Sequence, residues 1–208
     1  VIPGIDDEVI RLMQQGSTSK EALANIAGFR KLNADAAEPI LLSWVKGADE
    51  KTLSAIYPAL AVCGTVKSLK VLKTAAQQAV YPSNAIDAYL TLLHRLSAAG
   101  RTKIAAREAQ ELWKKNEHTF IQDAALQILM KSDKAHIASY LLFALTSGDK
   151  DLRNAALSNA SAYADPNIYE AVVSKFTALS TEAQVDVMNW LADHRVSSQI
   201  DAVVHAIG

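Results

Sequence analysis

The C-terminal half of this chain repeats an apolar pattern every 31 residues. Leu126, Leu157 and Met188 lie 31 residues apart, and the apolar positions around them keep the same spacing. A second set on the intervening segments follows the same step: Leu141, Val172 and Val203. A period between twenty and fifty residues is typical of repeats that bury their apolar faces only by stacking on their neighbours. Two apolar stripes per repeat therefore predict two helices per repeat and a helical solenoid.

Residues that start and end helices divide the chain into about a dozen helical segments. Thr18 and Glu21 have the spacing of a capping box. Other expected starts are Asp49, Thr65, Ser83 or Asn84, Thr102, Thr119, Asp133, Asp149, Asp165, Ser180 and Ser197. No segment alternates as a strand does over more than a few residues, so the predicted class is all-α.

Pairing the segments gives about six repeats, which we expect to form one domain spanning 1–208. The repeats cover 19–46, 50–79, 84–115, 119–146, 150–178 and 181–207, with 5–15 as an additional N-terminal helix. No low-complexity stretch or polar linker interrupts them. Each unit of a solenoid packs only on its neighbours, so the length of 208 residues does not by itself require two domains.

One repeat resembles HEAT-type (armadillo-like) repeats. Arg153, the small pair Ala155 and Ala156, and Leu157 are followed by Asp165-Pro166, an order similar to that of the family. The preceding repeat keeps the small pair and the Leu but has Gln122 in place of the Arg. Pro58 looks like the kinking proline of many first helices in that family. The resemblance implies a right-handed α-α superhelix in which the second helix of each pair lines a concave surface.

A weaker similarity is to the helical-repeat segments that precede sugar-hydrolase domains of the 3-keto-disaccharide type. The chain begins with Val1 rather than Met, so we expect it to be a piece of a longer protein. Val203, Val204 and Ile207 would have no cover on their outer side. The sequence therefore predicts a further element there or self-association, and it leaves the oligomeric state open.

The charge and composition disfavour two classes of partner. Lys and Arg total 21 against 22 Asp and Glu, whereas nucleic-acid binding normally needs a basic surface. No run approaches the ~20 apolar residues of a membrane span. Cys63 is the single cysteine, next to Ala61 and Val62, and we expect a buried structural thiol. The compartment stays open.

No catalytic or metal-binding pattern emerges from the sequence. The five histidines share no helix face at a spacing of four residues, which disfavours a zinc site. Ser17 and Lys20 have the spacing of an acylase motif, but its partner motifs are missing. No glycine-rich phosphate loop is present. We therefore predict no catalytic residue, no metal and no cofactor.

The repeat register does point to one candidate binding surface. Aligning the second helices places Glu108 and Tyr140 in one column outside the core stripe and Glu111, Phe143 and His205 in another. Aromatic side chains at positions expected to face solvent are typical anchors of protein interfaces; alternatively, the twist between repeats buries them. The candidate partner-binding residues are Glu108, Glu111, Tyr140, Phe143 and His205.

The tryptophans divide by the same register. Trp44 and Trp113 fall in core stripes, whereas Trp190 shares a column with Ile128 and Asn159. That column tolerates a polar side chain, so we expect Trp190 to be partly exposed and able to serve as a contact platform.

The leading hypothesis is a non-catalytic interaction module whose concave face binds a protein, a peptide or another domain of its own chain. The first alternative is an accessory domain of a carbohydrate-processing enzyme whose catalytic domain lies outside this chain. The second alternative is a nucleic-acid-binding repeat protein, which the balanced charge disfavours.

Overall fold

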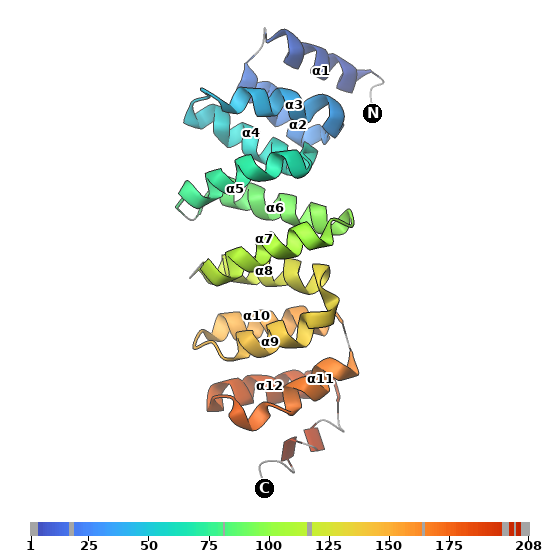
Figure 1. Cartoon of the computed structure of the whole chain (residues 1–208), viewed down its shortest axis with the longest axis vertical. Helices are drawn as coiled ribbons and strands as arrows, with labels where there is room; N and C mark the ends of the chain where they lie inside the picture. The colour runs from blue at the N-terminus through green and yellow to red at the C-terminus, as the bar shows by residue number, and fades with distance from the viewer. Residues whose placement is uncertain are drawn as a thin grey trace. The chain divides into compact units, whose positions relative to one another are not determined.

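The computed structural model describes residues 4–16, 19–80, 82–115, 118–163, 165–196, 200–201 and 203–204. In these ranges the chain forms twelve α-helices between Ile5 and Asp193, three short 3-10 helices and no strand (Figure 1). The predicted all-α class is therefore confirmed.

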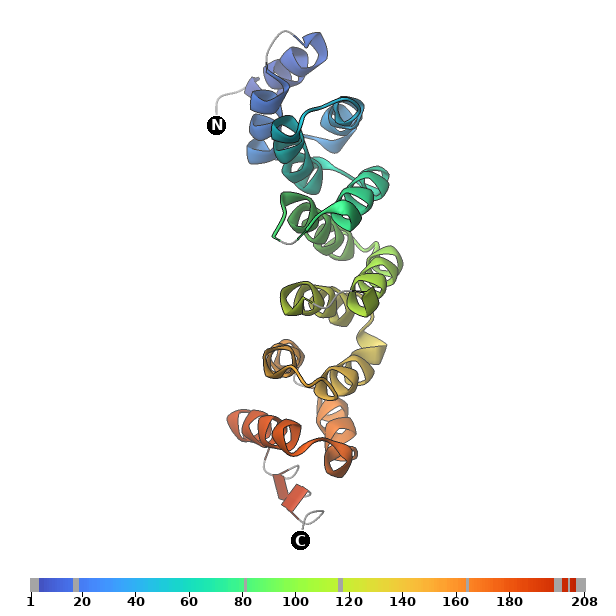
Figure 2. The same cartoon turned by 90° about the vertical axis from the view of Figure 1, so that its left-hand side faces the viewer.

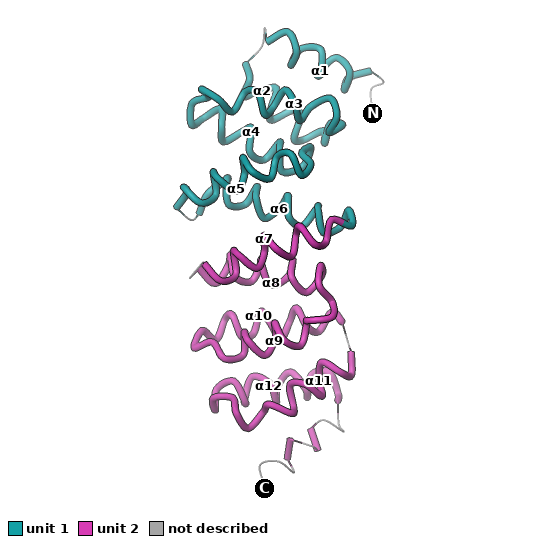
Figure 3. The backbone as a smooth tube through the Cα atoms, in the orientation of Figure 1, with its two compact units in different colours: residues 1–100 teal, residues 101–208 magenta. Residues whose placement is uncertain are grey.

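The contacts of the chain divide it into two compact units, Val1–Gly100 and Arg101–Gly208 (Figure 3). The first unit holds α1 (Ile5–Gln15), α2 (Lys20–Arg30), α3 (Ala34–Val45), α4 (Glu50–Cys63), η1 (Val66–Ser68), α5 (Leu69–Gln78) and α6 (Asn84–Ala98). The second holds α7 (Thr102–Lys115), α8 (Thr119–Ser132), η2 (Lys134–His136), α9 (Ile137–Leu145), α10 (Lys150–Ser161), α11 (Pro166–Val173), η3 (Phe176–Ala178) and α12 (Thr181–Asp193).

The boundary separates α6 from α7, which our pairing over 84–115 had joined. Helix α7 packs against α8, in its own unit. The pairing was based on distance along the sequence, which does not show which neighbouring helix α7 packs against. In the structure, the helix that contacts α7 most is α8, which follows it. A single domain over 1–208 stays a prediction.

Each unit, taken by itself, has two layers of helices (Figure 2). In the first unit α2, α4 and α6 pack in succession, while α3 and α5 form the other layer. In the second unit α8, α10 and α12 pack in succession, with α9 and α11 in contact in the other layer. Small residues permit the close approach, because a Cβ at Gly28 of α2 would lie 3.2 Å from the Ala59 Cα of α4.

The columns of the 31-residue register are the core of the second unit. Leu126 and Leu157 are buried, although Met188, the third member of that column, is only half-buried. The other buried members are Ala125, Ala156, Val187, Leu129, Ala160, Leu191, Leu141, Val172 and Val203. The placement of these columns in the core is confirmed. The column of Leu142, Val173 and Val204, which keeps the same spacing, is not in the core, because the first two are half-buried and Val204 is 58% exposed.

The helix starts follow local chemistry. The side chains of Asp49, Ser83 and Ser180 accept hydrogen bonds from backbone N–H groups in the first turns of α4, α6 and α12. At α2 the N-cap is Ser19; Thr18, expected in the capping box, lies outside the described residues, as does the start expected at Ser197. Asp133 starts the 3-10 helix η2, and α9 itself begins at Ile137.

Burial confirms three of the four expectations for single side chains. Trp44 and Trp113 are buried, and so is Cys63, whose thiol donates to the Ala27 carbonyl at 3.3 Å. The expectation for Trp190 is wrong, because only 6% of the residue is exposed. Its ring lies 4.8 Å from that of Tyr169, and its Nε1–H donates to the Ser161 hydroxyl. Contacts with α10 and α11 cover this indole.

Candidate functional site

The predicted binding surface lies on α7 and α9, both in the second unit. Phe143 on α9 is 63% exposed. The edge-to-face contact between its ring and that of Trp113 on α7 has a centroid distance of 5.8 Å. Trp113 is itself buried, so it provides a fixed support for the exposed ring. We call the surface formed by Glu111, Trp113, Tyr140 and Phe143 the α7–α9 surface.

Tyr140 is half-buried and belongs to a polar network at the start of α9. Its hydroxyl donates to Asp133 Oδ2 at 2.8 Å, while His136 Nδ1 lies 2.9 Å from Asp133 Oδ1. Burial and the hydrogen bond to the carboxylate raise the pKa of Tyr140 to about 12. The hydrogen bonds from His136 and Tyr140 hold the pKa of Asp133 below its usual value. The phenol is therefore a neutral, positioned donor at pH 7.

Two of the predicted acidic residues differ in their surroundings. Glu108 was expected to face solvent, and this is wrong, because the residue is 3% exposed. It lies on the buried face of α7 with Ala105, Ala109 and Trp113, where Arg107 donates two hydrogen bonds to its carboxylate. Glu111 is half-exposed and lies 3.6 Å from Lys115 Nζ.

The structure therefore places Tyr140 and Phe143 on α9 and the half-exposed Glu111 on α7, two helices that meet where the ring of Phe143 contacts Trp113. It removes Glu108 from the candidate surface. His205 lies outside the described residues.

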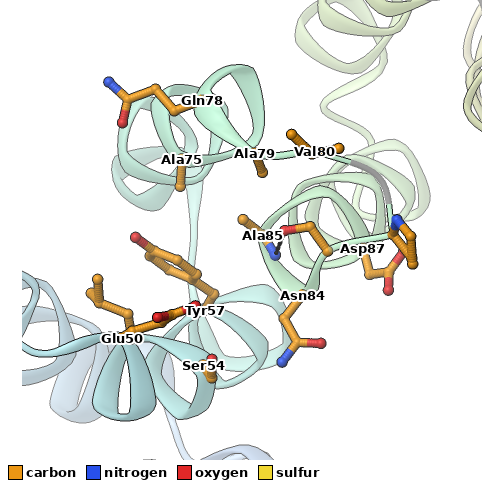
Figure 4. A pocket seen from close by; sticks show the side chains of 13 residues that line it. Glu50, Ser54, Tyr57, Ala75, Gln78, Ala79, Val80, Asn84, Ala85 and Asp87 are labelled. Atoms are coloured by element: carbon orange, nitrogen blue, oxygen red, sulfur yellow. Dashed lines mark hydrogen bonds between the residues drawn. The ribbon is translucent and has the colours of Figure 1, made fainter.

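A separate groove of about 660 Å³ lies in the first unit, among the ends of α4, α5 and α6. Glu50 and Tyr57 belong to α4, Val80 follows α5, and Asn84 and Asp87 belong to the first turn of α6 (Figure 4). No motif in the sequence predicts this groove, because its residues come from three separate helices. The one feature of the sequence that could have pointed to the groove is an acidic residue in the first turn of each of two neighbouring helices, Glu50 in α4 and Asp87 in α6.

A second opening, of about 650 Å³, lies between the loop before α10 and the start of α12. The buried Arg153 donates from Nε to Asp186 Oδ2 at 2.7 Å and from Nη1 to the Ser147 carbonyl at 2.9 Å. Lys150 and Glu182 also line the opening. Opposite charges balance there, so the opening favours neither an anionic nor a cationic ligand.

The described residues contain neither a metal-binding cluster nor a membrane-spanning helix. Among the described residues, no group of three or more His, Cys, Asp or Glu side chains could hold a metal ion. No helix in the same residues is long and apolar enough to cross a membrane.

Comparison of the chain with models of protein families, with curated proteins and with solved structures found no match.

Proposed function

We propose that this chain is a non-catalytic interaction module, built as a HEAT-like right-handed superhelix, that binds a protein or peptide on the α7–α9 surface. The observation that carries the proposal is the exposed ring of Phe143 packed against the buried Trp113. An apolar side chain of a partner gains by covering Phe143, and little side-chain entropy is lost because the ring is already supported.

Polar groups on the same two helices would set the orientation in which a partner binds. Tyr140, held by Asp133, presents a hydroxyl whose position is fixed before binding. On α7, Glu111 and Lys115 carry charges of opposite sign, and such charged residues form the polar rim of many interfaces. The partner that fits is a segment with an apolar anchor flanked by polar residues.

The experiment compares Phe143→Ala with Phe120→Ala. Phe120 lies on α8 of the same unit and is 51% exposed, so the two variants lose the same exposed side chain from different helices. Peptides are selected on the wild-type chain from a random library, and their dissociation constants are then measured for both variants. We expect Phe143→Ala to weaken binding by about 2 kcal/mol, roughly thirtyfold, as for an anchor residue.

Phe120→Ala should change the dissociation constant by less than about twofold. Thermal unfolding of each variant checks that the fold is kept. Selected peptides that bind Phe143→Ala as tightly as the wild type, or a library that yields no binder, would contradict the proposal.

A further inference from the structure

The groove among α4, α5 and α6 combines apolar walls with charge of one sign. Tyr57 is half-buried and supplies an aromatic wall, and Val80 at the rim is 85% exposed. The two charged side chains that line the groove, Glu50 and Asp87, are both carboxylates. No Lys, Arg or His is among the described residues that line it.

Neighbouring cations do not neutralise these carboxylates. Lys51, next to Glu50, pairs instead with Glu21 at 3.0 Å and does not line the groove. Within the described residues, the carboxylates of Glu50 and Asp87 have no ion-pair or hydrogen-bond partner. Both carboxylates are therefore available to a ligand. Both residues are exposed, so their carboxylates are open to solvent where they line the groove, and two charges of the same sign there attract a cation.

From this arrangement we infer that the groove binds an arginine-bearing segment of a partner peptide. The guanidinium reaches a carboxylate at Glu50 or Asp87, and its flat face or aliphatic stem lies against Tyr57. Val80 and the alanines of α5 accept an apolar residue next to the arginine in the peptide. The volume of about 660 Å³ is within the usual range of ligand sites. Asn84, at the start of α6, offers an amide to the peptide backbone (Figure 4).

Arginine fits this groove better than lysine. Its planar fork donates two parallel hydrogen bonds to one carboxylate and stacks on an aromatic ring, whereas an ammonium group keeps its water more strongly. An anionic ligand is repelled by both carboxylates. A neutral sugar could use the tyrosine and the polar groups, but it would leave the charge of the groove without a counterpart, so the peptide is favoured.

The test uses the full chain and three labelled peptides that differ only at the residue after a central leucine, which is arginine, lysine or glutamine. Amide shifts in the NMR spectrum locate the site, and titrations give the affinity. We expect the arginine peptide to shift the amides of Tyr57, Val80 and Asp87, and to bind at least about threefold more tightly than the lysine peptide. The glutamine peptide should bind at least about tenfold more weakly than the arginine peptide.

Glu50→Gln and Asp87→Asn keep the shape of the groove and remove one charge each. Each should weaken the arginine peptide about threefold or more, and the double variant about tenfold. Glu170→Gln, on the exposed side of α11 in the other unit, makes the same change in net charge and should have no effect. Phe143→Ala should also leave this binding unchanged, so the result is independent of the proposal for the α7–α9 surface.

Four outcomes would overturn the inference. The first is unchanged affinity in the double variant, and the second is a set of shifted amides outside the groove. The third is equal binding of the arginine and glutamine peptides. The fourth is a shift of the groove amides by a glucose oligosaccharide with no response to the arginine peptide. That last result would assign the groove to carbohydrate.

Discussion

Gly64 follows α4 at a position where a side chain has no room. A Cβ there would lie 2.3 Å from the Leu60 carbonyl oxygen and 2.5 Å from the Ser68 hydroxyl. The backbone angles, φ −75° and ψ 165°, suit any residue, so the requirement for glycine is one of space. Gly64→Ala should lower the free energy of unfolding by about 1–3 kcal/mol, the usual cost of overpacking.

Urea unfolding measures this effect, and Gly148→Ala is the matched control. A Cβ at Gly148 meets nothing within 4 Å, and its φ is not positive, so the change in stability should stay within about 0.5 kcal/mol. Equal stabilities of the two variants would show that the backbone after α4 relaxes without cost.

Glu38 on α3 fixes the turn before α5. The residue is 2% exposed, and its carboxylate accepts four hydrogen bonds of 2.6–3.1 Å from the N–H and hydroxyl groups of Thr65 and Ser68. Burial alone would raise the pKa of Glu38, but the hydrogen bonds outweigh it and lower the pKa below its ordinary value of 4.5. The charged form is therefore the one that the fold stabilises.

The pH dependence follows from that direction. Because the pKa is lower in the folded chain, the stabilisation is complete above pH 4.5 and is lost as the pH falls through the lowered pKa. Glu38→Gln should cost about 2 kcal/mol at pH 7, and the difference from the wild type should shrink at about pH 3. Urea unfolding at both pH values measures it. A difference that is the same at pH 7 and pH 3 would show that the carboxylate charge is not responsible.

At the scale of the helix, the features that could be predicted from the sequence are those set by residues close together in the chain, namely the helix caps and the buried columns. Asp49, Ser83 and Ser180 were expected to start helices, and each side chain caps the helix that follows it. A cap needs only its own residue and the next turn, so it can be read locally. The buried columns were predictable for a similar reason, because a stripe must recur at fixed spacing along each helix.

The sequence could not predict contacts that depend on how helices pack. Glu108 is buried because it shares a face with Ala105 and Ala109, and the spacing between repeats carries no information about that rotation. Trp190 is buried by Tyr169 on a different helix. The groove at Glu50 and Asp87 likewise exists only once three helix ends meet. Of the proposed binding surface, Tyr140, Phe143 and Glu111 were identified in advance.

The pair Arg153 and Asp186 connects α10 to α12, and both side chains are buried at a separation of 2.7 Å. Removing one partner leaves a buried charge uncompensated, so Arg153→Met or Asp186→Asn should each cost about 3–5 kcal/mol. The double variant Arg153→Met/Asp186→Asn leaves no charge and should be less destabilised than the sum of the single changes. A double-mutant cycle by urea unfolding measures the coupling, and purely additive effects would contradict it.

At the scale of the whole molecule, the division into two compact units implies that stability is local. Contacts concentrate within Val1–Gly100 and within Arg101–Gly208. In a helical solenoid, the architecture that we propose, stability is close to a sum of terms from each element and its neighbours. A small defect deep in one unit should therefore open that unit more often and leave the other nearly unchanged.

Two matched substitutions test this independence. Ile56 on α4 and Ile128 on α8 are both fully buried, one in each unit, and Ile→Val at either position removes one methylene group at a cost of about 1 kcal/mol. Hydrogen exchange read by mass spectrometry on the full chain should then show about fivefold faster exchange of the slow amides within the substituted unit. The slow amides of the other unit should keep their wild-type rates. If either substitution speeds amide exchange equally in both units, the chain unfolds as one cooperative body. The two units would then differ in their contacts but not in their stability.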